Sequence, residues 1–226
     1  MADFELFKDL PEFETVEKLL PKQIEERSME LIHQELKKRS IRLSAEHEKI
    51  ICRCIHTTAD FDYANILRFS QNAVTCFYEL IKTKSPVFVT DTNMALSGIN
   101  KAACEKFGIE CHCFMADTDV SELSKMTGFT RAVCSIDKAV RLYGERPLVF
   151  VIGNAPTALV RIRQLYDAGI CKPAFVIGVP VGFVNVEAAK KLVLKTNLPY
   201  IVSDGKKGGS TIAAAIVNAL LYSCSN

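Results

Sequence analysis

The stretch HTTADFDYA at residues 56–64 holds the side chains best suited to acid–base chemistry. His56 follows an apolar helical run, and Thr57 and Thr58 stand where that run gives way to acidic and aromatic residues. A free imidazole titrates near neutral pH, so it can donate a proton, but it also binds metals and packs in cores. From the residues alone, His56 is a packed histidine, a metal ligand or a proton donor.

Glycines and small polar residues gather in four loops that each follow an apolar run. The loops are DTNM (91–94), GNAPT (153–157), GVPVGFVN (178–185) and DGKKGGST (204–211). Glycine lets a ligand approach the backbone, and free N–H groups at helix starts attract anions, so these loops predict a site for an anionic ligand. The candidate contacts there are Thr92, Asn93, Asn154, Thr157, Gly182, Gly209 and Ser210. The polar side chains can equally cap their helices, and Asp91 is expected to hold a loop rather than touch an anion.

Five short apolar runs alternate with helical patterns from residue 86 onward. They are PVFVT (86–90), CHCF (111–114), PLVFVIG (147–153), PAFVIG (173–178) and PYIVS (199–203). Apolar strands separated by helices are typical of a parallel sheet buried on both faces. We therefore expect a doubly wound α/β fold, with a five-stranded parallel sheet in a flavodoxin-like three-layer α/β/α arrangement. Such folds bind ligands in the crevice beyond the carboxyl ends of the strands.

The expected connecting helices include ALSGINKAACEKFG (95–108), PTALVRIRQLYDAG (156–169) and STIAAAIVNALLYS (210–223). Before residue 85 the patterns are helical only, at 23–39, 44–55 and 70–82. No repeat or linker divides the chain. We therefore expect one domain over 1–226, with an all-helical N-terminal portion at 1–84 and an α/β core at 85–226.

Composition narrows the classes of protein. The net charge of +2 on 226 residues does not favour nucleic acid as a partner. No apolar run is long enough to span a bilayer, and MADFELFKDLPEFE is acidic where a signal peptide is basic and then apolar, so we expect no membrane partner and a cytoplasmic location. The nine cysteines lack CxxC spacing and lie mostly in apolar stretches, which is typical of reduced, buried thiols.

The spacing of cysteine and histidine disfavours a metal site, and the spacing of glycine and lysine in the loops disfavours a nucleotide site. If CHC at 111–113 is a strand, Cys111 and Cys113 face together and His112 faces away, which leaves two ligands where structural zinc needs four. We expect no metal bound by the protein. No loop fits G-x-G-x-x-G or G-x-x-x-x-G-K-[ST], and the lysines of GKKGGST precede its glycine pair, so a nucleotide-dependent α/β enzyme is a distant alternative.

Seven segments, in order from about residue 20 to the end, resemble the precorrin-8X methylmutase family of cobalamin biosynthesis. They are ERSMELI (26–32), HTTADFDYA (56–64), TDTNMALSGI (90–99), GFTRA (128–132), IGNAPTAL (152–159), GVPVGFVNVEAAK (178–190) and GGSTIAAAIVNALL (208–221). The resemblance implies a cofactor-free isomerase that moves a methyl group from C11 to C12 of a tetrapyrrole, precorrin-8 or cobalt-precorrin-8, by a formal 1,5-sigmatropic shift. Any cobalt arrives within the substrate, and HTTADFDYA looks closer to the cobalt-containing branch. A corrinoid carrier without turnover is the alternative.

The resemblance also implies roles for particular residues. His56 is the catalytic acid, which protonates the macrocycle beside the migrating methyl group, and Thr57 is placed to hydrogen-bond the imidazole or the substrate edge. Arg27, Ser28 and Arg131 are candidates to bind substrate carboxylates, although Arg27 can instead pair with Glu30 or Glu35 on its own helix. A homodimer with its pocket near the interface is implied as well.

Overall fold

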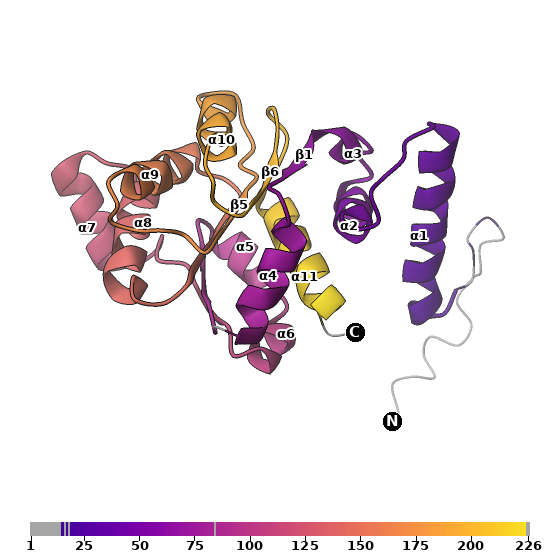
Figure 1. Ribbon diagram of the computed structural model, residues 1–226, viewed down its shortest axis with the longest axis horizontal. Helices are drawn as coiled ribbons and strands as arrows, with labels where there is room; N and C mark the ends of the chain where they lie inside the picture. Colours follow the sequence, from indigo (N-terminus) through magenta and orange to yellow (C-terminus); the bar gives the residue numbers. More distant parts are fainter. Residues whose placement is uncertain (1–14, 16, 18, 84, 225–226) are drawn as a thin grey trace, which may run out of the picture.

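The structure is a computed structural model that describes residues 15, 17, 19–83 and 85–224 (Figure 1). The helices are α1 (Pro21–Lys38), α2 (Glu48–Thr58), α3 (Tyr63–Ile66), α4 (Ala73–Thr83), α5 (Asn93–Gly98), α6 (Lys101–Lys106), α7 (Thr118–Thr127), α8 (Arg131–Tyr143), α9 (Pro156–Asp167), α10 (Val186–Leu194) and α11 (Ser210–Cys224). The strands are β1 (Leu67–Phe69), β2 (Val87–Thr90), β3 (Glu110–His112), β4 (Leu148–Ile152), β5 (Phe175–Gly178) and β6 (Tyr200–Ser203).

The strands form one sheet in the order β1-β6-β5-β4-β2-β3. The five expected strands, β2 to β6, all pair in parallel, which confirms the doubly wound α/β class. Their order is that of flavodoxin-like folds, in which the second strand lies outside the first. The chain therefore changes its direction of winding between β2 and β4, and the ends of these two strands mark the switch point.

Alternate residues of the central strands enter two cores, one on each face of the sheet. Val149, Val151, Phe175 and Ile177 belong to the core shared with α2, α4 and α11. Phe150, Ile152, Val176 and Val202 belong to the core shared with α8, α9 and α10. Figure 1 shows these two sets of helices on opposite sides of the sheet, and α1 at the margin of the molecule beside α2.

Strand β1 corrects two expectations, because the sheet in the described residues has six strands and the N-terminal portion is not all helical. Its Leu67 and Phe69 pair with Ser203 and Ile201 of β6 in antiparallel register. Only Leu67 of its three residues is buried, and Arg68 is exposed. Such a short edge strand directly after a helix has no alternation from which it could be predicted.

The segment expected as one helix at 95–108 is two helices. Ile99 is extended, and the Asn100 side chain caps α6 by accepting from the Ala103 N–H at 2.9 Å. The Asn100 N–H donates to Asn218 Oδ1 of α11, also at 2.9 Å. A Cβ at Gly98 would lie 2.8 Å from the Cβ of Ala214, so α5 needs this glycine to approach α11. Contacts with α11 therefore determine where the helix is interrupted between α5 and α6.

The cysteines are free thiols, and each is buried or half-buried. In the described part of the chain, no helix combines the length and the apolar character needed to cross a membrane.

Candidate functional site

Asp91 holds together the carboxyl ends of β2 and β4 at the switch point. It follows β2 directly, and its carboxylate accepts hydrogen bonds from the N–H groups of Gly153, Asn154 and Ala155 at 2.8, 2.8 and 2.5 Å. Burial raises the pKa of Asp91, and the three N–H donors oppose that shift. Asp91 thus holds the loop after β4, as the sequence predicted, and its carboxylate is only 1% exposed.

A pair of hydroxyls joins two helix starts above Asp91. Thr92 caps α5 by accepting from the Ala95 N–H, and its Oγ1 lies 2.8 Å from the Oγ of Ser210, the first residue of α11. The backbone of Gly153 packs against Ser210, since a Cβ there would lie 2.7 Å from the Ser210 Cα. The structure therefore brings together Thr92 and Ser210, and Asn93 beside them is exposed.

A second pair of hydroxyls joins the starts of α8 and α9. Thr130 caps α8 and lies 2.9 Å from Thr157, measured between the two Oγ1 atoms. Arg131 is the first residue of α8 and is exposed, as is Asn154 in the loop after β4. Within the described residues, the Arg131 guanidinium has no carboxylate or carbonyl partner. This cation at a helix start is available for an anionic ligand.

The loops after β5 and β6 are bonded to each other. The Gly209 N–H donates to the Val179 carbonyl at 2.8 Å, and the Gly182 N–H donates to the Lys206 carbonyl at 3.1 Å. Both glycines have positive φ, at 130° and 145°. These two hydrogen bonds engage both N–H groups within the protein. A contact of either glycine with the substrate stays a prediction, and it would rest on close approach to the backbone rather than on these donors.

His56 lies in the last turn of α2, and it is exposed. Its Nδ1 lies 2.7 Å from the Oγ of Ser28 on α1. Thr57 and Thr58 donate to the carbonyls of Arg53 and Cys54 at 2.8 Å, so Ser28 rather than Thr57 bonds the imidazole here, and a contact of Thr57 with the substrate edge stays a prediction. Ser28 occupies one ring nitrogen, and among the described residues nothing bonds Nε2.

The segment after His56 is tied to the carboxyl end of the sheet. The Lys207 ammonium, in the loop after β6, lies 2.6 Å from an oxygen of Asp60 and 2.6 Å from an oxygen of Asp62. These contacts lower the pKa of Asp60 and raise the pKa of Lys207. The end of α2 therefore lies at the same edge of the molecule as the four loops.

Exposed apolar side chains stand on three of the segments at this edge. They are Met94 after β2, Phe129 before α8, and Val181, Phe183 and Val184 after β5. Phe183 is 86% exposed and Met94 is 68% exposed. We did not predict these residues as site residues, although Phe129 and Phe183 each follow a glycine in a predicted loop. They offer apolar walls to a flat ligand whose charges lie at its rim.

Comparison with known proteins decides the family. A family model described as precorrin-8X methylmutase matches residues 23–223. The chain belongs to the precorrin-8X methylmutase family. It is 41% identical over 208 residues to the cobalt-precorrin-8 methylmutase of Leptospira interrogans, covering 89% of this chain and 93% of that protein. It is 44% identical to the cobalt-precorrin-8 methylmutase of Salmonella typhimurium, covering 78% and 81%.

A solved structure agrees. The crystal structure of precorrin-8x methyl mutase from Thermus thermophilus superposes with a TM-score of 0.81 at 34% identity, covering 90% of this chain and 96% of that one. The protein is thus an isomerase, a methylmutase of cobalamin biosynthesis, and the carrier alternative is not favoured.

The Arg27 side chain of the methylmutase forms ion pairs with two glutamates. Its guanidinium pairs with Glu17, which precedes α1, at 3.3 Å and with Glu30 of α1 at 3.3 Å. The hydrogen bond to Glu17 is the main cause that raises the pKa of Arg27. The plainer interpretation of Arg27 as a surface ion-pair residue therefore holds in the structure, with Glu30 rather than Glu35 as its helical partner.

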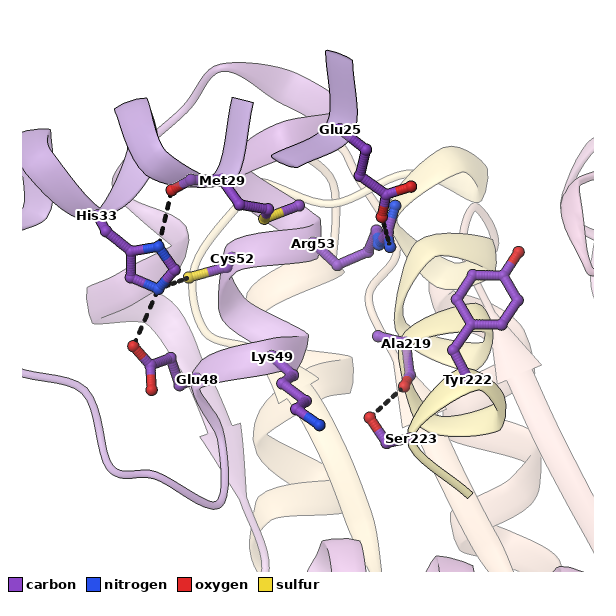
Figure 2. A pocket seen from close by; sticks show the side chains of 10 residues that line it. All are labelled: Glu25, Met29, His33, Glu48, Lys49, Cys52, Arg53, Ala219, Tyr222 and Ser223. Carbon is purple, nitrogen blue, oxygen red and sulfur yellow. Dashed lines mark hydrogen bonds and ion pairs between the residues drawn. The ribbon is translucent and has the colours of Figure 1, made fainter. Parts of the chain in front are cut away.

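Two cavities flank Arg53 and Tyr222 of the methylmutase. One, of about 500 Å³, lies between α1, α2 and α11 and contains none of the expected site residues. Figure 2 shows two pairs among the side chains that line it: Arg53 with Glu25, and His33 with Glu48. The other, of about 370 Å³, is lined by Thr57 together with Met94 and Thr211. This cavity lies between the end of α2 and the loops at the strand ends, so it is a better candidate for part of the substrate site than the first cavity.

In the described residues, no group of three or more histidine, cysteine, aspartate or glutamate side chains is arranged to hold a metal ion.

Proposed function

We propose that this methylmutase moves the methyl group from C11 to C12 of cobalt-precorrin-8, with His56 as the acid. The observation that carries the proposal is the imidazole near the carboxyl end of the sheet, which Ser28 bonds at Nδ1 and which no other described residue bonds at Nε2. An imidazole fixed through one nitrogen can present the other to a substrate in a set direction. Both relatives named above are cobalt-precorrin-8 methylmutases, which supports the cobalt-containing substrate.

The residues near the carboxyl end of the sheet suit both the macrocycle and the carboxylates of such a substrate. A proton from Nε2 to the macrocycle beside the migrating methyl group eases the shift, and the ring returns that proton afterwards. No electron is gained or lost, so the reaction needs no redox cofactor. Arg131 and the start of α8 suit a carboxylate at the rim, while Met94, Phe129 and Phe183 suit the flat ring.

The test of the acid is His56→Asn. Asparagine keeps a polar side chain that Ser28 can bond, but it cannot act as an acid. The variant should fold and bind the product, yet lose about 10² to 10⁴ in turnover, the usual contribution of general acid–base catalysis. Single-turnover absorbance under anaerobic conditions, with both metal-free and cobalt-containing substrate, measures the shift.

The matched control is His47→Asn, at the opposite end of α2, where the imidazole stacks on Phe69 at 3.8 Å between ring centroids. It should turn over like the unaltered enzyme. A wild-type rate in His56→Asn would show that the acid is another group. Equal conversion of the metal-free substrate would reject the cobalt preference.

We also propose that the enzyme works in the cytoplasm as a homodimer with its pockets near the interface. The free cysteines suit a reducing compartment. Leu20, Ile24 and Leu31 are exposed on α1 or at its start, and their spacing of four and seven residues places them on one face. That apolar face suits a second copy of the chain, because the same helix carries Ser28 and a partner seated on it would lie close to His56.

A further inference from the structure

A lysine is buried beneath the loop that joins β6 to α11. Lys190, on α10, has no exposed surface, and its Nζ lies 2.7 Å from the Gly205 carbonyl oxygen and 2.8 Å from the Lys207 carbonyl oxygen. Burial lowers the pKa of Lys190 to about 8, against the opposing effects of Asp204 and Glu187. The amine therefore remains mostly charged at neutral pH, and both hydrogen bonds are charge-assisted.

The loop above Lys190 is held by hydrogen bonds and ion pairs rather than by apolar packing. Residues 204–209 read DGKKGG and include no apolar side chain that could anchor them in the core. Gly205 and Gly209 have φ values of 82° and 130°, which few other residues adopt. The Lys207 carbonyl also accepts from the Ser203 hydroxyl at 2.8 Å. Lys190 bonds two carbonyls of this loop, one of them that of Lys207, and so contributes to the position of Lys207.

From Lys207 the contacts continue to the segment that carries His56. Its ammonium bridges Asp60 and Asp62, and the Asp62 N–H donates to the other oxygen of Asp60 at 3.0 Å. Asp60 is four residues beyond His56 and directly follows Ala59, the C-cap of α2, whose φ is 55°. A shift of Lys207 would thus move the end of α2.

We propose that Lys190 is a positioning residue of the methyl shift. By holding the carbonyls of Gly205 and Lys207, it places the Lys207 ammonium against Asp60 and Asp62, and so fixes the turn of helix that carries His56. This inference rests on the proposed role of His56. Its consequence is specific: loss of the Lys190 amine leaves substrate bound but misplaces the imidazole.

The first experiment compares Lys190→Met with Lys191→Met in the full-length enzyme. Methionine keeps the length and the packing of the lysine without its donors. Lys190→Met should slow single turnover at saturating substrate about 10- to 10²-fold, since a misplacement near 1 Å can cost that much. Its affinity for the product, measured by titration, should hardly change. Lys191 is the next residue of α10 and is exposed, so Lys191→Met should match the unaltered enzyme.

The second experiment is a double-mutant cycle with Lys207→Met. Lys207 is exposed, so this variant should keep the wild-type melting temperature and still turn over slowly. Because both lysines act through one contact chain, the double variant should be no slower than the slower single variant. Losses that multiply would overturn the proposal, as would a wild-type rate in folded Lys190→Met.

If Lys190→Met fails to fold, Lys207→Met decides alone. Slow turnover at an unchanged melting temperature supports the relay to His56, and full turnover refutes it. A wild-type rate in His56→Asn would reject the proposed acid whatever the lysine variants do, so failure of the proposed function and failure of the positioning role are distinguishable.

Discussion

His56 and Arg131 are candidate residues whose working atoms have no partner among the described residues. Ser28 bonds only Nδ1 of the imidazole, and Arg131 has no ion-pair partner among the described residues. The other arginine that was expected to bind carboxylate, Arg27, is already paired with two glutamates. At this scale, an unpaired cation beside a helix start is stronger support for anion binding than the residue type alone.

Arg131→Ala should therefore weaken product binding. A hydrogen bond to a charged group contributes about 1.5–3 kcal/mol, so we expect a loss in that range in an equilibrium titration. Arg131→Lys should recover part of it, because an ammonium cannot make the planar two-point contact of guanidinium. Arg141→Ala is the matched control, since Arg141 lies on the same helix near its other end and is exposed. Unchanged affinity in Arg131→Ala would assign this residue to the surface.

At the scale of elements, Asp91 joins the ends of β2 and β4 through three N–H donors. Asp91→Asn keeps the shape but replaces one acceptor oxygen with an amide nitrogen that faces these donors. The variant should lose about 1.5–3 kcal/mol of unfolding free energy, the range for hydrogen bonds to a charged group.

Urea denaturation measures the effect of Asp91→Asn, which should lower the midpoint and leave the slope unchanged. Asp167→Asn is the control, because Asp167 is an exposed residue whose pair with Arg163 lies on the surface of α9. If the two variants lose the same stability, the loop after β4 is held by other contacts.

The elements also show what could be predicted from the sequence. Strands β2, β4, β5 and β6 were predictable because each is a continuous apolar run, and Asp91 was predictable as a loop-holding residue because it follows such a run. Strand β3 spans Glu110–His112 and overlaps the expected CHCF (111–114) only in part. The break at Asn100 was not predictable, because Asn218 and Ala214 decide it from more than a hundred residues away. The same holds for the pairs Thr92–Ser210 and Ser28–His56, since the sequence places each residue at the end of an element but not its partner across the fold.

At the scale of the whole molecule, α1 lies at the margin beside α2 (Figure 1). Its inner face buries Ile32 and Leu36 against the core, while Ile24 and Leu31 face outward and are 54% and 48% exposed. Ser28 lies between these two faces, so α1 both supports His56 and presents an apolar surface. A helix that is apolar on two faces is typical of an element that packs against a further surface.

The homodimer proposal predicts a mass near twice 25.1 kDa by light scattering at assay concentration. Introducing charges by the double substitution Ile24→Glu and Leu31→Glu should shift the protein to monomer, because two carboxylates would have to be desolvated at the interface. Turnover should fall with the loss of dimer if the pocket lies near the interface, and the melting profile should show that each subunit stays folded. Leu142→Glu is the control: Leu142 is 52% exposed on α8, so the variant should remain dimeric and active. A fully active monomer, from either the unaltered chain or the α1 variant, would contradict both the dimer and the position of the pocket.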